Sequence, residues 1–432
     1  SGTYGWVFGQ IRVDPNDPET SYIMGVPFSA SSDGGKTYAT VRSPGGDNHA
    51  LWIDPANSSY LLKGFDQGVA VSYDKGKSWR YFRDELNVCQ FFNVNYDMAT
   101  PFRVYGSMQD HGSFRGKVDL SAGRDRIPAV AFEGAPGGEG SNHAVDPTDP
   151  DVVYSAGFYG TISRTEYGRP GPFPGRPFSK TILPVLYENE PPLRGQWVAP
   201  FILSPHNPDI LYHGMQYLFR SLDRGDTWER ISPDLTTDDP ATRGDVRYQT
   251  LFTISESPLK HGLLYAGTDD GRLWVTRDGG RAWREITAGL APGKWMSRVV
   301  ASAYGLGTVY LTQNGKRDDD FTPYVWKSVD YGRTWTDIAK GVPVGPVNVV
   351  REDPVRKDIL YLGTDMGVYV TRDGGATWAV LGGNLPTVYA LDLVVHPRDN
   401  VVVVATHGRG MWALDADKVN GGRARRRPAD ED

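Results

Sequence analysis

Short apolar runs closed by a proline turn recur along the chain. Each run ends in Asp-Pro or Ser-Pro, and a second run with Tyr and a closing Gly follows after a few polar residues, as at Leu51–Pro55 (LWIDP) and Ala144–Pro147 (AVDP). Proline cannot donate a ladder hydrogen bond, so it ends one strand and begins the turn to the next. The pattern predicts many pairs of short antiparallel strands.

A second phrase of eight residues returns six times. Its clearest copy is Thr371–Trp378 (TRDGGATW), and an Asp followed two positions later by Gly is a turn signal. The carboxylate is able to accept backbone N–H bonds, Gly takes a positive φ, and the Trp is expected to pack back over the hairpin. The Asp residues of the six copies are Asp33, Asp74, Asp223, Asp278, Asp330 and Asp373.

Together the two phrases define units of four strands, A to D, with Pro in the A–B turn and the eight-residue phrase in the C–D turn. Nine units begin near Gly9, His49, Gln90, Asn142, Trp197, Thr250, Ser297, Pro346 and Tyr389. About 48 residues per unit is the period of β-propeller blades. The last unit stops after three strands, so we expect a strand from elsewhere in the chain to close the ring.

The eight-residue phrase resembles the Asp-box, or BNR repeat, of sialidases, family 74 xyloglucanases and sortilin/VPS10-type propellers. The order of phrases resembles bacterial sortilin/VPS10-like BNR proteins of the glycosyl-hydrolase type, through residues such as Asn48–Pro55, Gly106–Ser113 and Thr406–Gly410. The resemblance implies an all-β fold of four-stranded blades in tandem propellers, with the boxes on the face away from the functional one.

Under the tandem arrangement, residues 1–89 form the last two blades of a preceding propeller and residues 90–419 form a complete seven-bladed ring. Residues 420–432 (GGRARRRPADED) form a charged C-terminal tail. We also expect an N-terminal propeller portion to precede Ser1. The alternative is one ring of eight to ten blades.

Composition narrows the classes of partner. The net charge is −6 and no basic face is apparent, which argues against nucleic acid. A single Cys, Cys89, excludes an intrachain disulfide, and no run of about 20 apolar residues would span a membrane. We expect an extracellular or periplasmic protein without a cofactor or metal site, although His49, His111 and His143 beside Asp110 offer a weaker metal alternative.

Candidate binding residues gather on the B–C and D–A loops, opposite the boxes. Glu139 and Asn142 are among them, and the predicted ligand-binding residues are His49, Gln109, His111, His143, Trp197, Gln216, Asp269, Asp270, Trp295, Arg298, Arg317, Asp365, His407 and Arg409. Carboxylates beside Trp and Tyr suit a carbohydrate, because aromatic faces stack on sugar CH surfaces.

Asp66 and Asp110, each in a Gly-flanked B–C loop, are the candidate catalytic pair for glycoside hydrolysis, which needs a separation of about 5–9.5 Å. The structural alternative is that they cap loops by accepting N–H bonds. Because the loops are short, the sequence favours a non-catalytic module of sortilin or assembly-factor type that binds proteins, peptides or glycans. The alternative function is a polysaccharide hydrolase.

Overall fold

The structure is a computed structural model that describes residues 8–82, 86, 88–185, 188–244 and 248–419. These residues form nine antiparallel sheets, eight with four strands and one with three. The prediction of an all-β propeller fold built from four-stranded blades is therefore confirmed. The predicted tail, residues 420–432, lies outside the described residues.

The chain divides into two compact units, Ser1–Val88 and Cys89–Asp432. The first unit holds two sheets, each with its strands in chain order. Their strands are β1 (Ile11–Asp14), β2 (Asp17–Ile23), β3 (Ser29–Ser31) and β4 (Ala39–Thr40), then β5 (Asn48–Ile53), β6 (Leu61–Phe65), β7 (Gly68–Ser72) and β8 (Arg80–Phe82).

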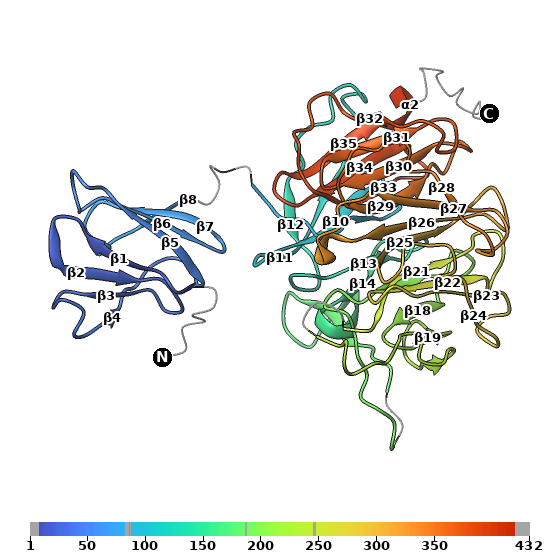
Figure 1. The fold of residues 1–432 in the computed structure, drawn as a ribbon, viewed down its shortest axis with the longest axis horizontal. Coiled ribbons are helices and arrows are strands. Elements are labelled where there is room, and N and C mark those ends of the chain that lie inside the picture. Colours follow the sequence, from blue (N-terminus) through green and yellow to red (C-terminus); the bar gives the residue numbers. More distant parts are fainter. Residues whose placement is uncertain (1–7, 83–85, 87, 186–187, 245–247, 420–432) are drawn as a thin grey trace. The chain divides into compact units, whose positions relative to one another are not determined.

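The second unit holds the other seven sheets, which follow one another in chain order (Figure 1). The first four sheets consist of β9 (Asn95–Tyr96), β10 (Arg103–Met108), β11 (Gly112–Lys117), β12 (Phe132–Gly134); β13 (His143–Val145), β14 (Val152–Ala156), β15 (Ile162–Pro170), β16 (Pro177–Thr181); β17 (Phe201–Leu203), β18 (Leu211–Gly214), β19 (Leu218–Ser221), β20 (Glu229–Arg230); and β21 (Leu251–Glu256), β22 (Leu264–Thr268), β23 (Leu273–Thr276), β24 (Arg284–Glu285).

The last three sheets consist of β25 (Trp295–Ala301), β26 (Val309–Asn314), β27 (Tyr324–Ser328), β28 (Thr336–Asp337); β29 (Val347–Glu352), β30 (Leu360–Thr364), β31 (Gly367–Thr371), β32 (Ala379–Val380); and β33 (Ala390–Val395), β34 (Val401–Thr406), β35 (Gly410–Asp415). Three helical turns complete the unit: η1 (Phe158–Gly160), η2 (Lys316–Asp318) and α2 (Ala416–Val419).

The seven first strands form a closed cycle. β9, β13, β17, β21, β25, β29 and β33 each contact the next in this order, and β33 contacts β9. Residues of the first and last sheets, such as Phe91, Val104 and Val403, share one buried cluster. The second unit is therefore a seven-bladed ring with the first strand of each blade innermost.

The ring closes without the expected fourth strand in its last blade. Among the described residues, nothing pairs with the outer edge of β35. Instead, the chain entering the first blade crosses the end of β34, where the Phe91 N–H donates to Thr406 O (3.1 Å) and the Gly408 N–H donates to Cys89 O (2.8 Å). Shared apolar burial and these hydrogen bonds join the two ends of the ring.

Backbone hydrogen bonds fix the two ends of each blade. The Gly374 N–H of a C–D turn donates to Asp358 O (2.8 Å) of the A–B turn in the same sheet. At the opposite end, the Asp365 N–H of the B–C loop donates to Pro346 O (3.1 Å), just before strand A. Since these pairs recur in other blades, the predicted blade register, with boxes and B–C loops at opposite ends, is confirmed.

In all six eight-residue turns the Asp carboxylate accepts the N–H of the residue four positions on, and in five of them it also accepts that residue's hydroxyl, since the Asp278 turn has Ala282 there. At Thr371–Trp378, the Thr377 N–H and hydroxyl donate to the two carboxylate oxygens of Asp373 at 2.9 and 2.6 Å. The Gly375 N–H donates to the Thr371 hydroxyl (3.0 Å), and Gly375 has φ +101°. The predicted role of the carboxylate as acceptor of turn N–H groups is confirmed.

In three of the four eight-residue turns of the ring, the indole N–H of the Trp donates to the preceding blade and not to its own hairpin. The indole N–H of Trp378 donates to Ile338 O (2.7 Å), which follows the last strand of the preceding sheet. Trp335 and Trp283 do the same to Ile286 O (2.9 Å) and Ile231 O (2.7 Å). The expectation of local packing holds for Trp79 of the first unit, which donates to Gly76 O (3.1 Å).

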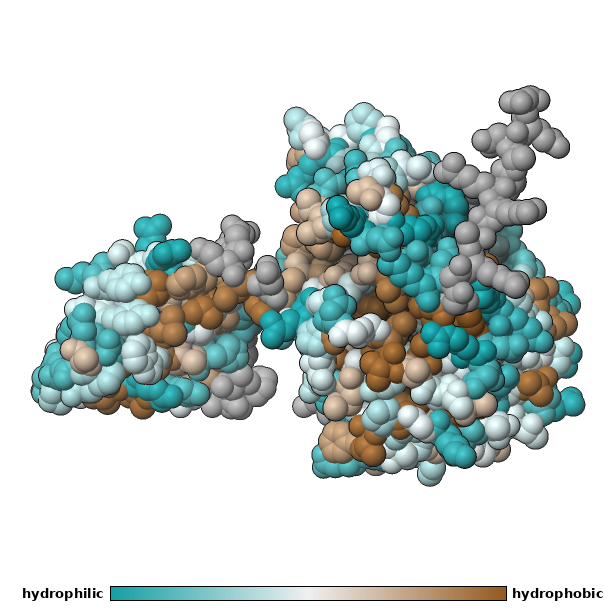
Figure 2. Space-filling view, turned by 90° about the horizontal axis from the view of Figure 1, so that it is seen from above, coloured by the Kyte–Doolittle hydropathy of each residue, from teal (hydrophilic) through white to brown (hydrophobic). Residues whose placement is uncertain are grey.

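Apolar residues reach the surface in separate patches between hydrophilic ones on the side drawn in Figure 2. The large apolar cores lie between consecutive sheets. One core joins Tyr310 and Ile338 of one blade to Val347, Leu360 and Tyr369 of the next. Each blade therefore buries the apolar side chains of its faces against the neighbouring blades.

We expect Trp378→Phe to lower the free energy of unfolding by about 1 kcal/mol, because the ring stays but the inter-blade hydrogen bond is lost. Trp228→Phe is the matched control, since the indole N–H of Trp228 is buried without an acceptor among the described residues. Urea unfolding followed by Trp fluorescence measures both. Equal losses in the two variants would contradict the inter-blade role.

The turns also predict a pH dependence. Hydrogen bonds from the residue four positions on lower the pKa of Asp33, Asp74 and Asp330 from 3.8 to about 2, and bonds from the Thr371 and Thr377 hydroxyls lower the pKa of Asp373. A lowered pKa stabilises the fold above pH 3.8, and this contribution is lost as the pH falls towards 2.

We therefore expect the urea concentration at the unfolding midpoint to decrease as the pH is lowered from 5 to 2.5. The fall should be smaller in Asp373→Asn, which cannot ionise at this turn. Parallel pH profiles for the two proteins would show that Asp373 contributes nothing to acid sensitivity.

Candidate functional site

A cavity of about 900 Å³ lies inside the ring unit and is lined mainly by the innermost strands and the loops that precede them. Its aromatic lining includes Phe92, Tyr159, Trp197, Tyr248, Phe252 and Trp295. Its charged lining is Arg298, Lys316, Arg317, Arg351, Glu352, Asp365 and Asp392. Concave sites of this size with few polar groups among aromatic rings are typical of ligand binding.

Two Trp residues hold their rings against other aromatic groups. Trp197 stacks on Phe158 with the ring centroids 4.9 Å apart, and Phe92 meets it edge-on at 5.0 Å. Trp295 meets Phe252 edge-on at 4.6 Å. Both Trp residues are thereby positioned as rigid faces on the cavity wall.

Charged side chains in the cavity are largely paired. The Lys316 ammonium lies 2.8 Å from Asp365, and the Asn348 amide donates to the same carboxylate at 3.0 Å. The Arg317 guanidinium lies 3.9 Å from the centroid of the Trp295 ring. Of the predicted binding residues, the cavity thus brings together His143, Trp197, Trp295, Arg298, Arg317 and Asp365.

Asp110 lies beside a second carboxylate. The Asp110 N–H donates to Glu139 Oε2 (2.8 Å), and Gln109 Nε2 lies 3.3 Å from Glu139 Oε1 and 3.4 Å from Asp110 Oδ1. Asp110 has φ +56° in the tight B–C loop of the first blade. His111 in the same loop is exposed, and its Nδ1 lies 2.7 Å from Gln109 O.

The predicted catalytic partner Asp66 belongs to the first unit, whereas Asp110 belongs to the second. Within its own unit, Asp66 Oδ1 lies 2.5 Å from Nε2 of His49, whose ring meets Phe8 edge-on at 4.7 Å. The pairing of Asp66 with Asp110 stays a prediction.

His143 and His407, two of the predicted binding residues in the ring, are held by contacts within the protein. Burial lowers the pKa of His143 to about 4, and its Nε2 lies 2.9 Å from Pro136 O. Burial also lowers the pKa of His407. The backbone N–H of His407 donates to Tyr389 O (2.8 Å) at the start of the last blade. In the described ranges no group of three or more His, Cys, Asp or Glu is arranged to hold a metal ion.

Arg409, in the same loop as His407, donates its N–H to the Thr406 hydroxyl (3.1 Å).

Asp269 and Asp270 hold the loop before β21. Asp269 accepts the N–H groups of Tyr248 (2.7 Å) and Thr250 (2.9 Å) and the amide of Gln196 (3.0 Å), and burial raises its pKa to about 6. Asp270 accepts the N–H and hydroxyl of Thr237. Because Gln196 precedes Trp197 and Tyr248 lines the cavity, Asp269 positions the aromatic lining, whereas Asp270 holds the loop at Thr237.

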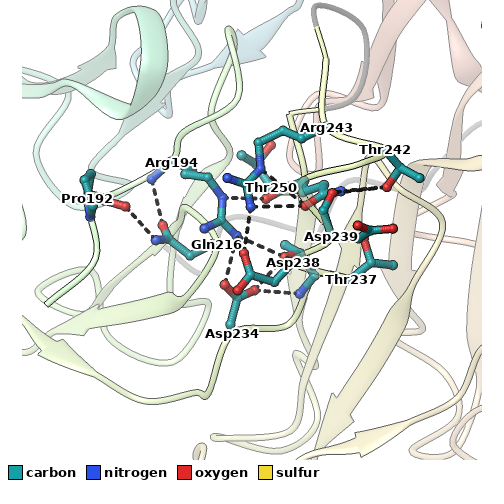
Figure 3. Close-up of polar contacts among 12 residues, drawn as sticks. Pro192, Arg194, Gln216, Asp234, Thr237, Asp238, Asp239, Thr242, Arg243 and Thr250 are labelled. Atoms are coloured by element: carbon teal, nitrogen blue, oxygen red, sulfur yellow. Dashed lines mark hydrogen bonds and ion pairs between the residues drawn. The ribbon is translucent and has the colours of Figure 1, made fainter.

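Gln216 has the same structural role. It accepts the Arg194 N–H (2.8 Å) and donates to Pro192 O (2.9 Å). The Arg194 side chain points at Asp234 (2.9 Å) and Asp238 (3.2 Å), which Arg243 also binds (2.7 Å), as Figure 3 shows. This network, Arg194 with Asp234, Asp238 and Arg243, ties two long loops together beside the cavity.

The binding residues predicted from the sequence do not include Arg351 or Asp392. Both lie on innermost strands, within the otherwise apolar runs VNVVRE and ALDLVV. A charged residue in such a run is the signal that would find them, because a buried charge requires a partner. The turn phrases drew attention to the loops instead.

Sequence comparison finds xyloglucanases. One from a Paenibacillus species is 28% identical over 269 residues, covering 54% of this chain and 26% of the relative. Xyloglucanase Xgh74A of Acetivibrio thermocellus is 28% identical over 279 residues, covering 54% of this chain and 31% of the relative. The chain therefore spans roughly a quarter to a third of the length of these relatives. No protein-family model matches the chain.

Among solved structures, the GH74 xyloglucanase from Xanthomonas campestris covers 95% of this chain and 83% of its own, with 15% identity and a TM-score of 0.32. The xyloglucanase sequence relatives support a glycoside-hydrolase-like propeller architecture. They favour the hydrolase alternative over the non-catalytic module that the short loops had indicated. The likeness to sortilin stays a prediction.

We expect Arg194→Met to loosen the loop that contains Asp234–Arg243, because the guanidinium joins two acidic side chains to the neighbouring loop. Trypsin should then cut after Arg243 several-fold faster than in the parent protein. Arg220→Met is the control, since Arg220 pairs with the exposed Glu229 (2.6 Å) on outer strands. Unchanged cleavage would show that the network does not hold the loop.

The described helices include none that is both long and apolar enough to cross a membrane.

Proposed function

We propose that this chain is part of a glycoside hydrolase that acts on a polysaccharide of the β-glucan class. A polymeric substrate of this kind is met outside the cytoplasm, so the proposal includes an extracellular or periplasmic location. The xyloglucanases that align with about half of the chain support it. Their activity is a property of proteins three to four times the aligned length.

The observation that carries the proposal is the pairing of Asp110 with Glu139. Since one nitrogen of Gln109 contacts both carboxylates, at 3.3 and 3.4 Å, their nearest oxygens are at most about 7 Å apart, below the upper limit of about 9.5 Å for hydrolytic pairs. Glycoside hydrolysis needs one carboxylic acid to protonate the departing oxygen and one carboxylate to activate water or attack the anomeric carbon.

The contacts of the two groups favour different roles. Glu139 accepts hydrogen bonds from the Asp110 N–H and the Gln109 amide, which stabilise its ionised form. Glu139 therefore suits the base or nucleophile. Asp110 receives only the longer contact from the Gln109 amide (3.4 Å), so the acid role falls to Asp110.

Aromatic rings near the cavity supply the second requirement, a surface for sugar rings. Trp197 and Phe158 form a stacked pair, and Phe158 is 37% exposed. Sugar CH groups pack on such faces, and this packing would hold a chain while the glycosidic bond is cleaved. His49, Asp66, His111, His407 and Arg409 remain proposed binding residues on the same kind of loop.

A second candidate is a binding module without catalysis, for a glycan, peptide or protein. The favouring observation is that Asp365 and Asp392, two of the three carboxylates that line the cavity, are both paired with Lys or Arg. Paired carboxylates serve recognition more readily than proton transfer.

The test is the release of reducing ends from xyloglucan and mixed-linkage β-glucan. Asp110→Asn and Glu139→Gln should each lower kcat by about 100-fold or more with a small change in KM, because each removes a proton-transfer group. Glu229→Gln, a matched loss of charge on the outer strand β20, should leave kcat unchanged. Full activity in Asp110→Asn would exclude the proposed pair, and glycan binding without hydrolysis in the parent protein would favour the binding module.

A further inference from the structure

Two arginines in the cavity wall share one carboxylate. Arg298 on β25 and Arg351 on β29 each donate through Nη2 to Oδ1 of Asp392 on β33, at 3.0 and 3.1 Å. The three residues come from three consecutive innermost strands, and all three line the cavity. The ring therefore assembles this group from positions about 40 to 95 residues apart in the chain.

The group carries one positive charge more than its partner neutralises, since two guanidinium ions face one carboxylate. Asp392 is further engaged by the N–H groups of Leu393 (3.0 Å) and Val94 (3.3 Å). Arg351 also donates through Nε to Leu393 O (2.8 Å). By contrast, Arg298 Nε is buried and has no acceptor among the described residues.

The other charged groups of the cavity do not remove the excess. Lys316 pairs with Asp365, and Glu352 accepts the Ser302 hydroxyl (2.7 Å) and the Ala303 N–H (2.7 Å) at the turn. Arg317 lies over the Trp295 ring. The cavity lining thus contains four cations and three carboxylates.

Burial, and then the nearby positive charge of Arg351, lower the pKa of Arg298 to about 10, against the opposing effect of Asp392. Arg298 remains protonated at neutral pH. A buried guanidinium with an unused N–H and a like charge beside it is stabilised by a second anion.

We propose that Arg298 and Arg351 bind the carboxylate of an acidic sugar residue, so that the cavity selects a uronate-bearing polysaccharide. Guanidinium groups match the planar geometry of a carboxylate. Trp295, three residues before Arg298 on the same strand, also lines the cavity and brings an aromatic group beside the arginines. The inference rests on the proposed function for the carbohydrate nature of the ligand, and on Arg298, Arg351 and Asp392 for its charge.

The test compares two probes that differ in one chemical group. Cellotriose and the same trisaccharide oxidised to carboxylates at C6 are titrated into the full chain by calorimetry. We expect the oxidised trisaccharide to bind at least about tenfold more tightly, the difference that a charge-assisted hydrogen bond supplies. Equal affinities would overturn the inference. Sodium acetate is the third probe, and binding of acetate as tight as that of the oxidised trisaccharide would show a simple anion site without sugar recognition.

Two cavity variants with opposite expected effects distinguish binding at this site from an effect of the protein's net charge. Arg298→Gln should abolish the preference for the oxidised trisaccharide, whereas Asp392→Asn should increase it by removing the competing carboxylate. Arg220→Gln removes the same charge from the outer strands and should leave the preference intact. Thermal unfolding checks that each variant is folded. If either cavity variant does not fold, the parent protein's discrimination between the two trisaccharides still decides the proposal.

Failure of this inference is distinguishable from failure of the proposed function. Hydrolysis of neutral β-glucan without any preference for the oxidised trisaccharide would overturn the acidic ligand alone. A preference that depends on Arg298, without hydrolysis of any glycan, would retain the acidic site and reject the hydrolase.

Discussion

Burial between neighbouring blades is the interaction on which the ring depends. The main cores lie where one sheet packs on the next, so a blade removed from the ring would expose both of its faces. This makes closure decisive: the last blade must bury Val403 and its neighbours against Phe91 and Val104 of the first. The hydrogen bonds of Phe91 and Gly408 fix the register of that contact. The eight-residue turns stabilise the same arrangement, because Trp378, Trp335 and Trp283 each donate to the preceding blade.

Closure also determines the chemistry of the interior. The innermost strands of seven blades converge on one axis, and the polar side chains among them face one another across a limited volume. Charges held there lose hydration and are stable when they are paired. Lys316 with Asp365 meets this requirement one to one, whereas Arg298 and Arg351 share Asp392. The unequal group is where a ligand's charge has the greatest effect, because an added anion completes a pairing that the protein leaves incomplete.

The fold was readable from the sequence because its signals are local. Asp373 and Gly375 define a turn within eight residues, and the proline turns mark the other hairpin of each blade. The destination of the Trp378 indole was not readable, since its acceptor, Ile338, lies 40 residues away and is set by blade packing. For the same reason the loops with Trp197 and Asp365 were found, but their grouping with Arg351 was not. Gln216 and Asp269 were predicted to bind a ligand, but both bond to loop backbone groups. The sequence does not distinguish these roles, because the same amide and carboxylate groups bind either a ligand or the backbone.

The two ends of the blades are therefore held by different kinds of hydrogen bond, local at one end and long-range at the other. At the box end, each turn satisfies its own N–H groups through one Asp and a Ser or Thr, so its geometry is largely independent of the rest of the protein. At the opposite end the B–C loops are tight, but the connections from β16 to β17 and from β20 to β21 are long and depend on distant partners, such as Arg194 with Asp234 and Gln196 with Asp269. Changes in those loops alter Trp197, Tyr248 and Asp110 without disturbing the turns that connect blade to blade. Because the turns and the long connections rest on separate sets of hydrogen bonds, substitutions in those connections leave the bonds of the eight-residue turns intact.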